Sequence, residues 1–79
     1  MTTQQSTAEV VRQVIAEVSR RPIEEVRPDA VLMDDLGIRS FSRVELAVVL
    51  EDRLDLSLTD DEVMRFKTVA DVIAAAEKR

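Results

Sequence analysis

The chain contains a single glycine and two prolines in 79 residues, which leaves little material for the tight turns of a β-sheet protein. Its apolar residues recur instead at the spacing that places them on one face of an α-helix. Only 3% of the residues are aromatic, so Leu, Val, Ile and Ala must do the packing. The sequence therefore predicts an all-α fold, and a chain of this length makes one domain (residues 1–79) with a modest core.

The first predicted helix begins at a capping box, in which Ser6 accepts a bond from a backbone N–H and Glu9 returns one. Apolar residues follow at helical spacing, so we expect a helix over residues 7–20. Pro22 ends this helix, because proline disfavours the helical conformation at the residue before it. Residues 1–5 are polar, and we expect them to form a disordered tail.

A long connection over residues 22–38 separates the first helix from the second. Loops of this length need anchors of their own or a function. We expect the loop to contain one short helical turn and to be pinned across the helices by its apolar residues. These are Ile23, Val26, Val31, Leu32 and Leu36.

Three further helices are predicted. The second spans residues 40–54, and a capping-box pattern at Thr59 opens a short third helix through about residue 65. The last helix begins at Thr68. The residues expected to pack inward along this part of the chain are Phe66, Val69, Val72, Ile73 and Ala76. The expected architecture is a small bundle of three main helices and one short helix, with a long first loop.

The second predicted helix has two apolar faces. The face that we assign to the core holds Leu46, Val49, Leu50 and Leu54. The opposite face holds Phe41, Val44 and Val48, interleaved with Glu45, Glu51 and Asp52. One interpretation buries Val44 and Val48 in the core as well. We favour an exposed apolar patch on an acidic surface, because the neighbouring charges would be costly to bury unpaired.

The formal net charge is −5, and residues 42–62 alone hold seven acids against two bases. Nucleic-acid binding needs a basic surface and is disfavoured, whereas a basic protein partner fits. No apolar run is long enough to span a membrane, and the N-terminus lacks the character of a signal peptide, so we expect a cytoplasmic protein. The chain has no cysteine and no histidine, so we expect no catalytic residues and no metal site.

The only glycine, Gly37, is followed three residues later by Ser40, where the second predicted helix begins. Glycine allows positive φ or close packing, and serine is a good helix N-cap, so the pattern by itself describes a loop ending in a capped helix. The wider pattern resembles the phosphopantetheine attachment site of acyl carrier proteins. The residues that carry the resemblance are Asp35-Leu36-Gly37, Ser40, Val44-Glu45-Leu46, Leu50-Glu51-Asp52 and residues 67–73.

This resemblance covers residues 7–76 and implies a carrier, not an enzyme. In the family, a phosphopantetheinyl transferase moves the 4'-phosphopantetheine arm from coenzyme A onto the serine, which here is Ser40. The transferase largely holds the Mg²⁺ that this step uses. The arm's thiol then carries an acyl group as a thioester to the acyl-loading, acyl-transfer and condensing enzymes of fatty-acid, polyketide or related biosynthesis. Ser42 is a weaker candidate, because it lies two residues beyond the family position.

The resemblance also implies that partner enzymes dock on the second helix through basic surfaces. The residues that would bear this role are Phe41, Val44, Glu45 and Val48, supported by Glu51 and Asp52. The sequence departs from the family pattern at Arg39, which replaces an aspartate, and at Phe41, which replaces a leucine. We expect Arg39 to set partner choice. The alternative is that Arg39 is a solvated charge, paired with Asp34 or Asp35.

The leading interpretation is a free-standing, monomeric acyl carrier, since the chain begins at Met1 and has room for no other domain. An aminoacyl or peptidyl carrier is an alternative, but such carriers usually show a second glycine where Ile38 or Arg39 stands here. An alternative of another class is an unmodified helical adaptor that binds basic partners through the second helix. A hydrolase built on Ser40 is disfavoured, because no histidine is available as its base.

Overall fold

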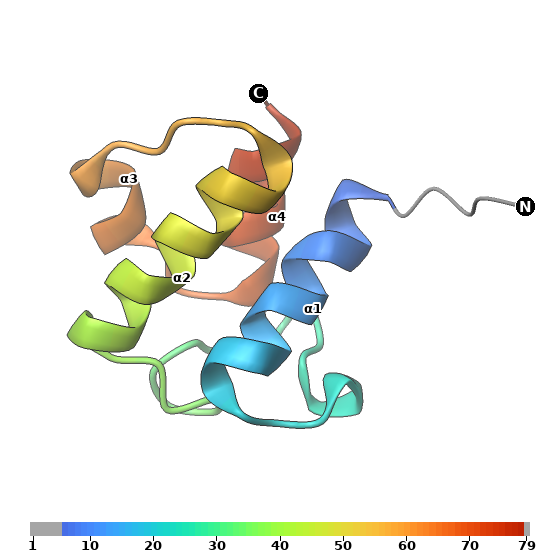
Figure 1. The fold of residues 1–79 in the computed structure, drawn as a ribbon. Helices are drawn as coiled ribbons and strands as arrows, with labels where there is room; N and C mark the ends of the chain where they lie inside the picture. The colour runs from blue at the N-terminus through green and yellow to red at the C-terminus, as the bar shows by residue number, and fades with distance from the viewer. Residues whose placement is uncertain (1–5, 79) are drawn as a thin grey trace, which may run out of the picture.

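The computed structural model describes residues 6–78, and the tail expected at residues 1–5 lies outside them. The elements, in chain order, are α1 (Thr7–Ser19), a 3₁₀ turn η1 (Ile23–Glu25), α2 (Ser40–Leu54), α3 (Asp60–Arg65) and α4 (Val69–Glu77). Helix α1 packs against both α2 and α4, and the short α3 lies beside α2 (Figure 1). The predicted all-α fold of three main helices and one short helix is confirmed.

Side chains fix the start of three of the four α-helices in the described part of the chain. Capping boxes open α1, α3 and α4, and their residue pairs are Ser6–Glu9, Thr59–Glu62 and Thr68–Asp71. Helix α1 ends one residue earlier than predicted, because Arg20 takes a left-handed conformation with φ of 60°. The chain therefore turns away from the helix before Pro22 is reached.

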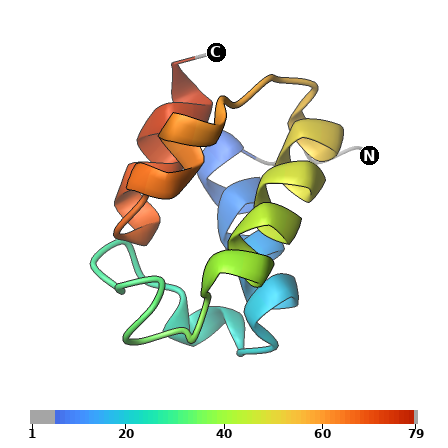
Figure 2. The same cartoon turned by 90° about the vertical axis from the view of Figure 1, so that its left-hand side faces the viewer.

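The long connection between α1 and α2 crosses one end of the bundle (Figure 2). Arg12 of α1 holds its first part, because Nε donates to the carbonyl oxygen of Val26 at 2.8 Å and Nη2 to that of Ile23 at 3.1 Å. The η1 turn is the short helical turn expected there. An isolated antiparallel bridge between Val31 and Thr68 fastens the later part to the start of α4.

The core is aliphatic and draws on every helix. Of the predicted loop anchors, Val26, Leu32 and Leu36 are buried, whereas Ile23 and Val31 are only partly buried. The buried side chains of the helices and the α3–α4 link include Val11, Val14, Ile15, Leu46, Leu50, Val63, Phe66, Val69, Val72 and Ala76. The predicted core residues Val49, Leu54 and Ile73 lie half-buried at its edge. Across the described residues, no helix has the length and apolar character needed to cross a membrane.

Candidate functional site

The turn that leads into α2 depends on the backbone conformation of Gly37. Its φ is 67°, in the left-handed region that glycine enters without a Cβ penalty. A Cβ built there would meet no atom within 4 Å, so conformation and not crowding explains the glycine. The turn closes with two backbone bonds, from the Gly37 amide to the Met33 carbonyl oxygen at 3.1 Å and from the Ile38 amide to that of Leu32 at 2.8 Å.

Asp35 supports the same turn through its side chain. Its Oδ2 accepts a hydrogen bond from the backbone amide of Val31 at 2.7 Å. Leu36 and Ile38, on either side of the glycine, are buried in the core. The turn is therefore held by backbone bonds, a carboxylate and two core side chains, and it places the next residues at the start of α2.

Ser40 is the first residue of α2, and its side chain is exposed. The N-cap is Arg39, which has extended backbone angles and makes no side-chain capping bond. The prediction that Ser40 caps the helix is therefore wrong, because the serine lies one residue too late to accept a bond from the first turn. Its hydroxyl has no hydrogen-bond partner among the residues that the structure describes.

The start of α2 also leaves backbone donors free. The first intrahelical bond runs from the Arg43 amide to the Arg39 carbonyl oxygen at 2.7 Å, so the amides of residues 40–42 have no partner within residues 6–78. The first turn contains no acid, and Arg39 beside it is exposed. Free N–H groups at a helix N-terminus favour an anionic group. The geometry thus suits a phosphate ester on the Ser40 hydroxyl.

The outer face of α2 exposes three apolar side chains. Phe41 is 84% exposed, Val44 57% and Val48 58%. The alternative that buries Val44 and Val48 in the core is therefore wrong. Glu45 and Asp52 are exposed on the same helix, so an apolar patch with acidic neighbours is present.

The structure bears on two of the charges singled out in the sequence: the expected docking role of Glu51 and the alternative pairing of Arg39. Glu51 is partly buried, and its Oε2 accepts a bond from the Leu58 amide at 2.8 Å, so its carboxylate holds the chain segment after α2. Arg39 forms no ion pair with Asp34 or Asp35 in the described structure. The carboxylate of Asp35 is instead engaged by the backbone.

Sequence reasoning missed Arg43, the one charged side chain that is buried within residues 6–78, at 7% exposed. Its Nη1 donates to the carbonyl oxygens of Val63, at 3.1 Å, and Phe66. The guanidinium thus ties α2 to the link between α3 and α4. Helical spacing could have revealed it, because Arg43, Leu46 and Leu50 follow one stripe of α2.

Metal binding finds no support in the part of the chain that the structure describes. No group of three or more carboxylates lies close enough to hold an ion there, and the sequence contains no histidine or cysteine. The chemistry that the site offers is therefore that of a free serine hydroxyl beside unpaired amides.

A family model described as "Phosphopantetheine attachment site" matches residues 9–76. An acyl carrier protein of Thermobifida fusca is 39% identical over 66 residues, which cover 84% of each chain. A meromycolate extension acyl carrier protein of Mycolicibacterium smegmatis is 36% identical over 76 residues, covering 96% of this chain and 77% of that protein.

The fold has a counterpart among solved structures. A Mycobacterium tuberculosis protein, described provisionally as an acyl carrier protein, superposes with a TM-score of 0.83 at 28% sequence identity. The match covers 92% of this chain and 97% of that one. Sequence and fold therefore point to the same family.

Proposed function

This chain belongs to the acyl carrier protein family, and from that membership we propose that Ser40 is the residue that carries the phosphopantetheine arm. Acyl carrier proteins are carriers and not catalysts. One observation supports Ser40 above all: its exposed hydroxyl has no partner in the described structure and stands at the uncapped start of α2. Ser42, two residues further on, is already partly buried.

In the transfer step, Oγ of Ser40 attacks the phosphorus of coenzyme A that bears the arm. The Oγ–H bond and the pyrophosphate P–O bond break, an Oγ–P bond forms, and adenosine 3',5'-bisphosphate leaves. The proton must leave to a base of the transferase or to solvent, since this chain has no histidine. The phosphodiester then lies next to the free amides of the first turn and to the positive charge of Arg39, which favour its negative charge. The protein's own part is to present the hydroxyl and to stabilise the product.

The arm also supplies the group that the chain itself lacks. The sequence contains no cysteine, so the thiol that holds the cargo as a thioester comes from the phosphopantetheine. An acyl cargo is favoured over an aminoacyl one by the similar proteins, which include acyl carriers and one named for meromycolate extension. We therefore propose a role in the biosynthesis of fatty-acid-like chains.

Partner enzymes are proposed to dock on the outer face of α2 through basic surfaces. The proposed contact residues are Arg39, Phe41, Val44, Glu45, Val48 and Asp52. Their exposure and the acidity of residues 42–62 support this role. Glu51, predicted to assist, is better explained by its bond to the Leu58 amide. We propose that the carrier works as a monomer in the cytoplasm, as expected from the sequence.

Intact mass spectrometry tests the proposed function. The protein is incubated with coenzyme A, Mg²⁺ and a promiscuous phosphopantetheinyl transferase, with parallel samples that lack either coenzyme A or the transferase. A carrier is expected to gain the mass of one phosphopantetheine with coenzyme A. With acyl-coenzyme A in its place, the gain should be larger by the mass of the acyl group. No gain in the complete mixture would favour the unmodified helical adaptor.

A further inference from the structure

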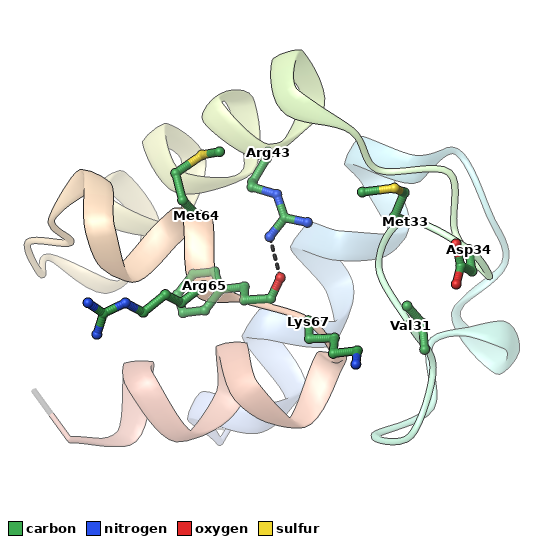
Figure 3. A pocket seen from close by; sticks show the side chains of 8 residues that line it. Val31, Met33, Asp34, Arg43, Met64, Arg65 and Lys67 are labelled. Atoms are coloured by element: carbon green, nitrogen blue, oxygen red, sulfur yellow. Dashed lines mark hydrogen bonds between the residues drawn. The ribbon is translucent and has the colours of Figure 1, made fainter.

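A groove of about 360 Å³ lies beside the first turn of α2 (Figure 3). It is formed by the loop before α2, by α2 itself, and by the end of α3 together with the α3–α4 link. Its walls include the apolar side chains of Val31, Met33, Met64 and Phe66, and Arg43 of α2 reaches into it. The exposed charged residues Asp34, Arg65 and Lys67 complete the lining. The groove therefore has apolar walls, a charged outer edge and one buried cation, Arg43.

The guanidinium of Arg43 has donors left over. An arginine side chain carries five N–H donors, and here only Nη1 is engaged, by the carbonyl oxygens of Val63 in α3 and of Phe66 in the α3–α4 link. Nε and Nη2 have no partner among the described residues. Because no fully enclosed side-chain nitrogen in that part of the chain lacks a partner, these two nitrogens open to solvent, although the residue as a whole is only 7% exposed. In Figure 3 the second terminal nitrogen is turned toward the side of the groove that Met33 lines.

The charge of Arg43 is not balanced by a carboxylate. None of the ion pairs within residues 6–78 includes it, and Asp34, the one acid on the groove wall, does not reach it. The other two cations that line the groove, Arg65 and Lys67, are exposed, and their charged ends point away from Arg43 (Figure 3). Buried charges are normally paired, and a carboxylate matches the arginine fork best. The open donors of Arg43 thus suit an anionic oxygen group.

The position of the groove indicates where that group comes from. Arg43 lies three residues after Ser40, which is about one turn of the same helix. Residues three apart are neighbours on the surface of a helix, so an arm attached at Ser40 starts close to Arg43 and is flexible enough to fold back into the groove. The two methionines of the wall adapt to ligands of different shape, which suits a short run of methylene groups.

We propose that this groove binds an acyl cargo that ends in a carboxylate, the thioester of a dicarboxylic acid, and that Arg43 receives the carboxylate through Nε and Nη2. The proposal rests on the proposed function, since the cargo must be carried on the Ser40 arm. It adds a preference among cargoes: diacid thioesters are held in the groove, whereas simple acyl chains of the same length gain no such contact.

The test compares four forms of the protein: unmodified, with the bare arm, with a pentanoyl thioester and with a glutaryl thioester. Intact mass first verifies that each load is complete, so a failure of the proposed function is seen before any comparison is made. Thermal unfolding then measures the effect of each cargo. We expect the glutaryl form to melt roughly 4–8 °C above the pentanoyl form, the shift that one modest added interaction gives a domain of this size.

This direction of the shift is diagnostic. The chain already has a net charge of −5, so one more unpaired negative charge should leave the melting temperature unchanged or lower it. Equal melting temperatures for the glutaryl and pentanoyl forms would overturn the proposal. If the form with the bare arm already melts as high as the glutaryl form, the proposal is also overturned. The groove would then bind the amide oxygens of the arm and not the carboxylate of the cargo.

Variants locate the effect. Arg43→Gln should remove the difference between the glutaryl and pentanoyl forms, and the matched control Arg65→Gln, on the same groove wall, should keep it. A difference that persists in Arg43→Gln would contradict the role of Arg43. If that variant does not fold, NMR of the Arg43 side chain in the wild-type protein decides. Its Nε–H resonance should shift with glutaryl and not with pentanoyl, and an unchanged resonance would overturn the assignment.

Discussion

Gly37 holds a left-handed backbone conformation in the turn that leads to Ser40, with φ of 67°. A Cβ at this position would meet open space, so the cost of a larger side chain is the strain of the left-handed backbone conformation alone. We predict that Gly37→Ala lowers the free energy of unfolding by about 1–2 kcal/mol, the usual penalty of that region for an L-residue. Gly37→Asn should lose less, because asparagine tolerates the left-handed region. Urea unfolding measures both, and equal losses would indicate a cause other than backbone strain.

Asp71 links the stability of the fold to pH. Hydrogen bonds from the backbone amides of Thr68 and Lys67, at 3.0 and 2.9 Å, lower the pKa of its carboxyl below the usual range. Because the folded-state pKa is lowered, the stabilisation is present above the unfolded value of about 3.9 and is lost as pH falls through the folded pKa.

We therefore predict that Asp71→Asn lowers the melting temperature at pH 7 and that its difference from the wild type narrows below about pH 4. The control is Asp52→Asn, since the Asp52 carboxylate is exposed and accepts no hydrogen bond from the described residues. Melting curves between pH 2.5 and pH 7 give the comparison. A difference between Asp71→Asn and the wild type that does not change with pH would refute the linkage.

Arg39→Asp is predicted to have opposite effects on stability in the protein without the arm and in the protein that carries it. As an exposed cation at a helix N-terminus it is unfavourable by roughly 0.3–1 kcal/mol, so Arg39→Asp should slightly stabilise the unmodified protein. Once Ser40 carries a phosphodiester, the arginine faces a negative charge, and the same substitution should destabilise. Urea unfolding of both forms at low and moderate salt measures the change in the free energy of unfolding. A change of the same sign in both forms would show that Arg39 does not interact with the phosphodiester.

Single residues mark both the success and the limits of prediction from sequence. The left-handed Gly37 and the three capping boxes follow from local chemistry and could be predicted. The residue type of Ser40 favours the N-cap position, but Arg39 takes that position and Ser40 is already the first residue of the helix. Arg43 was overlooked because a charged residue is expected to be solvated, although its place on the inner stripe of α2 pointed inward.

Helix α2 carries the two surfaces on which the proposed function depends. Its inner side packs Leu46 and Leu50 into the core, and its outer side exposes Phe41, Val44 and Val48. The boundaries of this helix, residues 40–54, were predicted correctly, because two apolar stripes and a clear start define it. The consequence is that substitutions on the two sides should have different effects.

We predict that Val48→Asp slows modification by a transferase with a basic docking surface, while the helical circular dichroism and melting temperature stay near wild type. Val48 is 58% exposed, so the new charge is solvated and disturbs only docking. The matched control Leu50→Asp should unfold the protein, because it buries an unpaired charge in the core. Unfolding by Val48→Asp, or an unchanged rate, would count against the docking face.

Glu45→Lys tests the acidic part of the same face. It should slow the same reaction several-fold, and added salt should reduce the gap between variant and wild type, since exposed charges are screened beyond about 8 Å at physiological ionic strength. Initial rates at three salt concentrations give the result. A gap that does not depend on salt would show that the contribution of Glu45 is not electrostatic.

The long loop shows what the sequence could not reveal at the scale of elements. Its length, its short helical turn and most of its anchors were predicted from its apolar residues. Its fastening to α1 through Arg12 and to the start of α4 through the bridge to Thr68 was not. These contacts join residues that are far apart in the sequence, so no local sequence pattern predicts them.

At the scale of the whole molecule, the loop, the start of α2, the end of α3 and the α3–α4 link meet around Arg43 (Figure 3). Family and fold class could be predicted because the motif, the acidity and the helix order are all local patterns that can be read along the chain. The groove could not, because three distant segments form it and its polar group is a buried arginine. The structure therefore adds a cargo preference to a carrier that the sequence already indicated.

The attachment of the arm to Ser40 is the central claim, and peptide mapping of the modified protein tests it most directly. After incubation with coenzyme A and a transferase, the phosphopantetheine should be found on Ser40 in the wild type and in Ser42→Ala. Ser40→Ala should gain no mass while keeping its helical circular dichroism. Modification that persists in Ser40→Ala, or that maps to Ser42, would contradict the assignment.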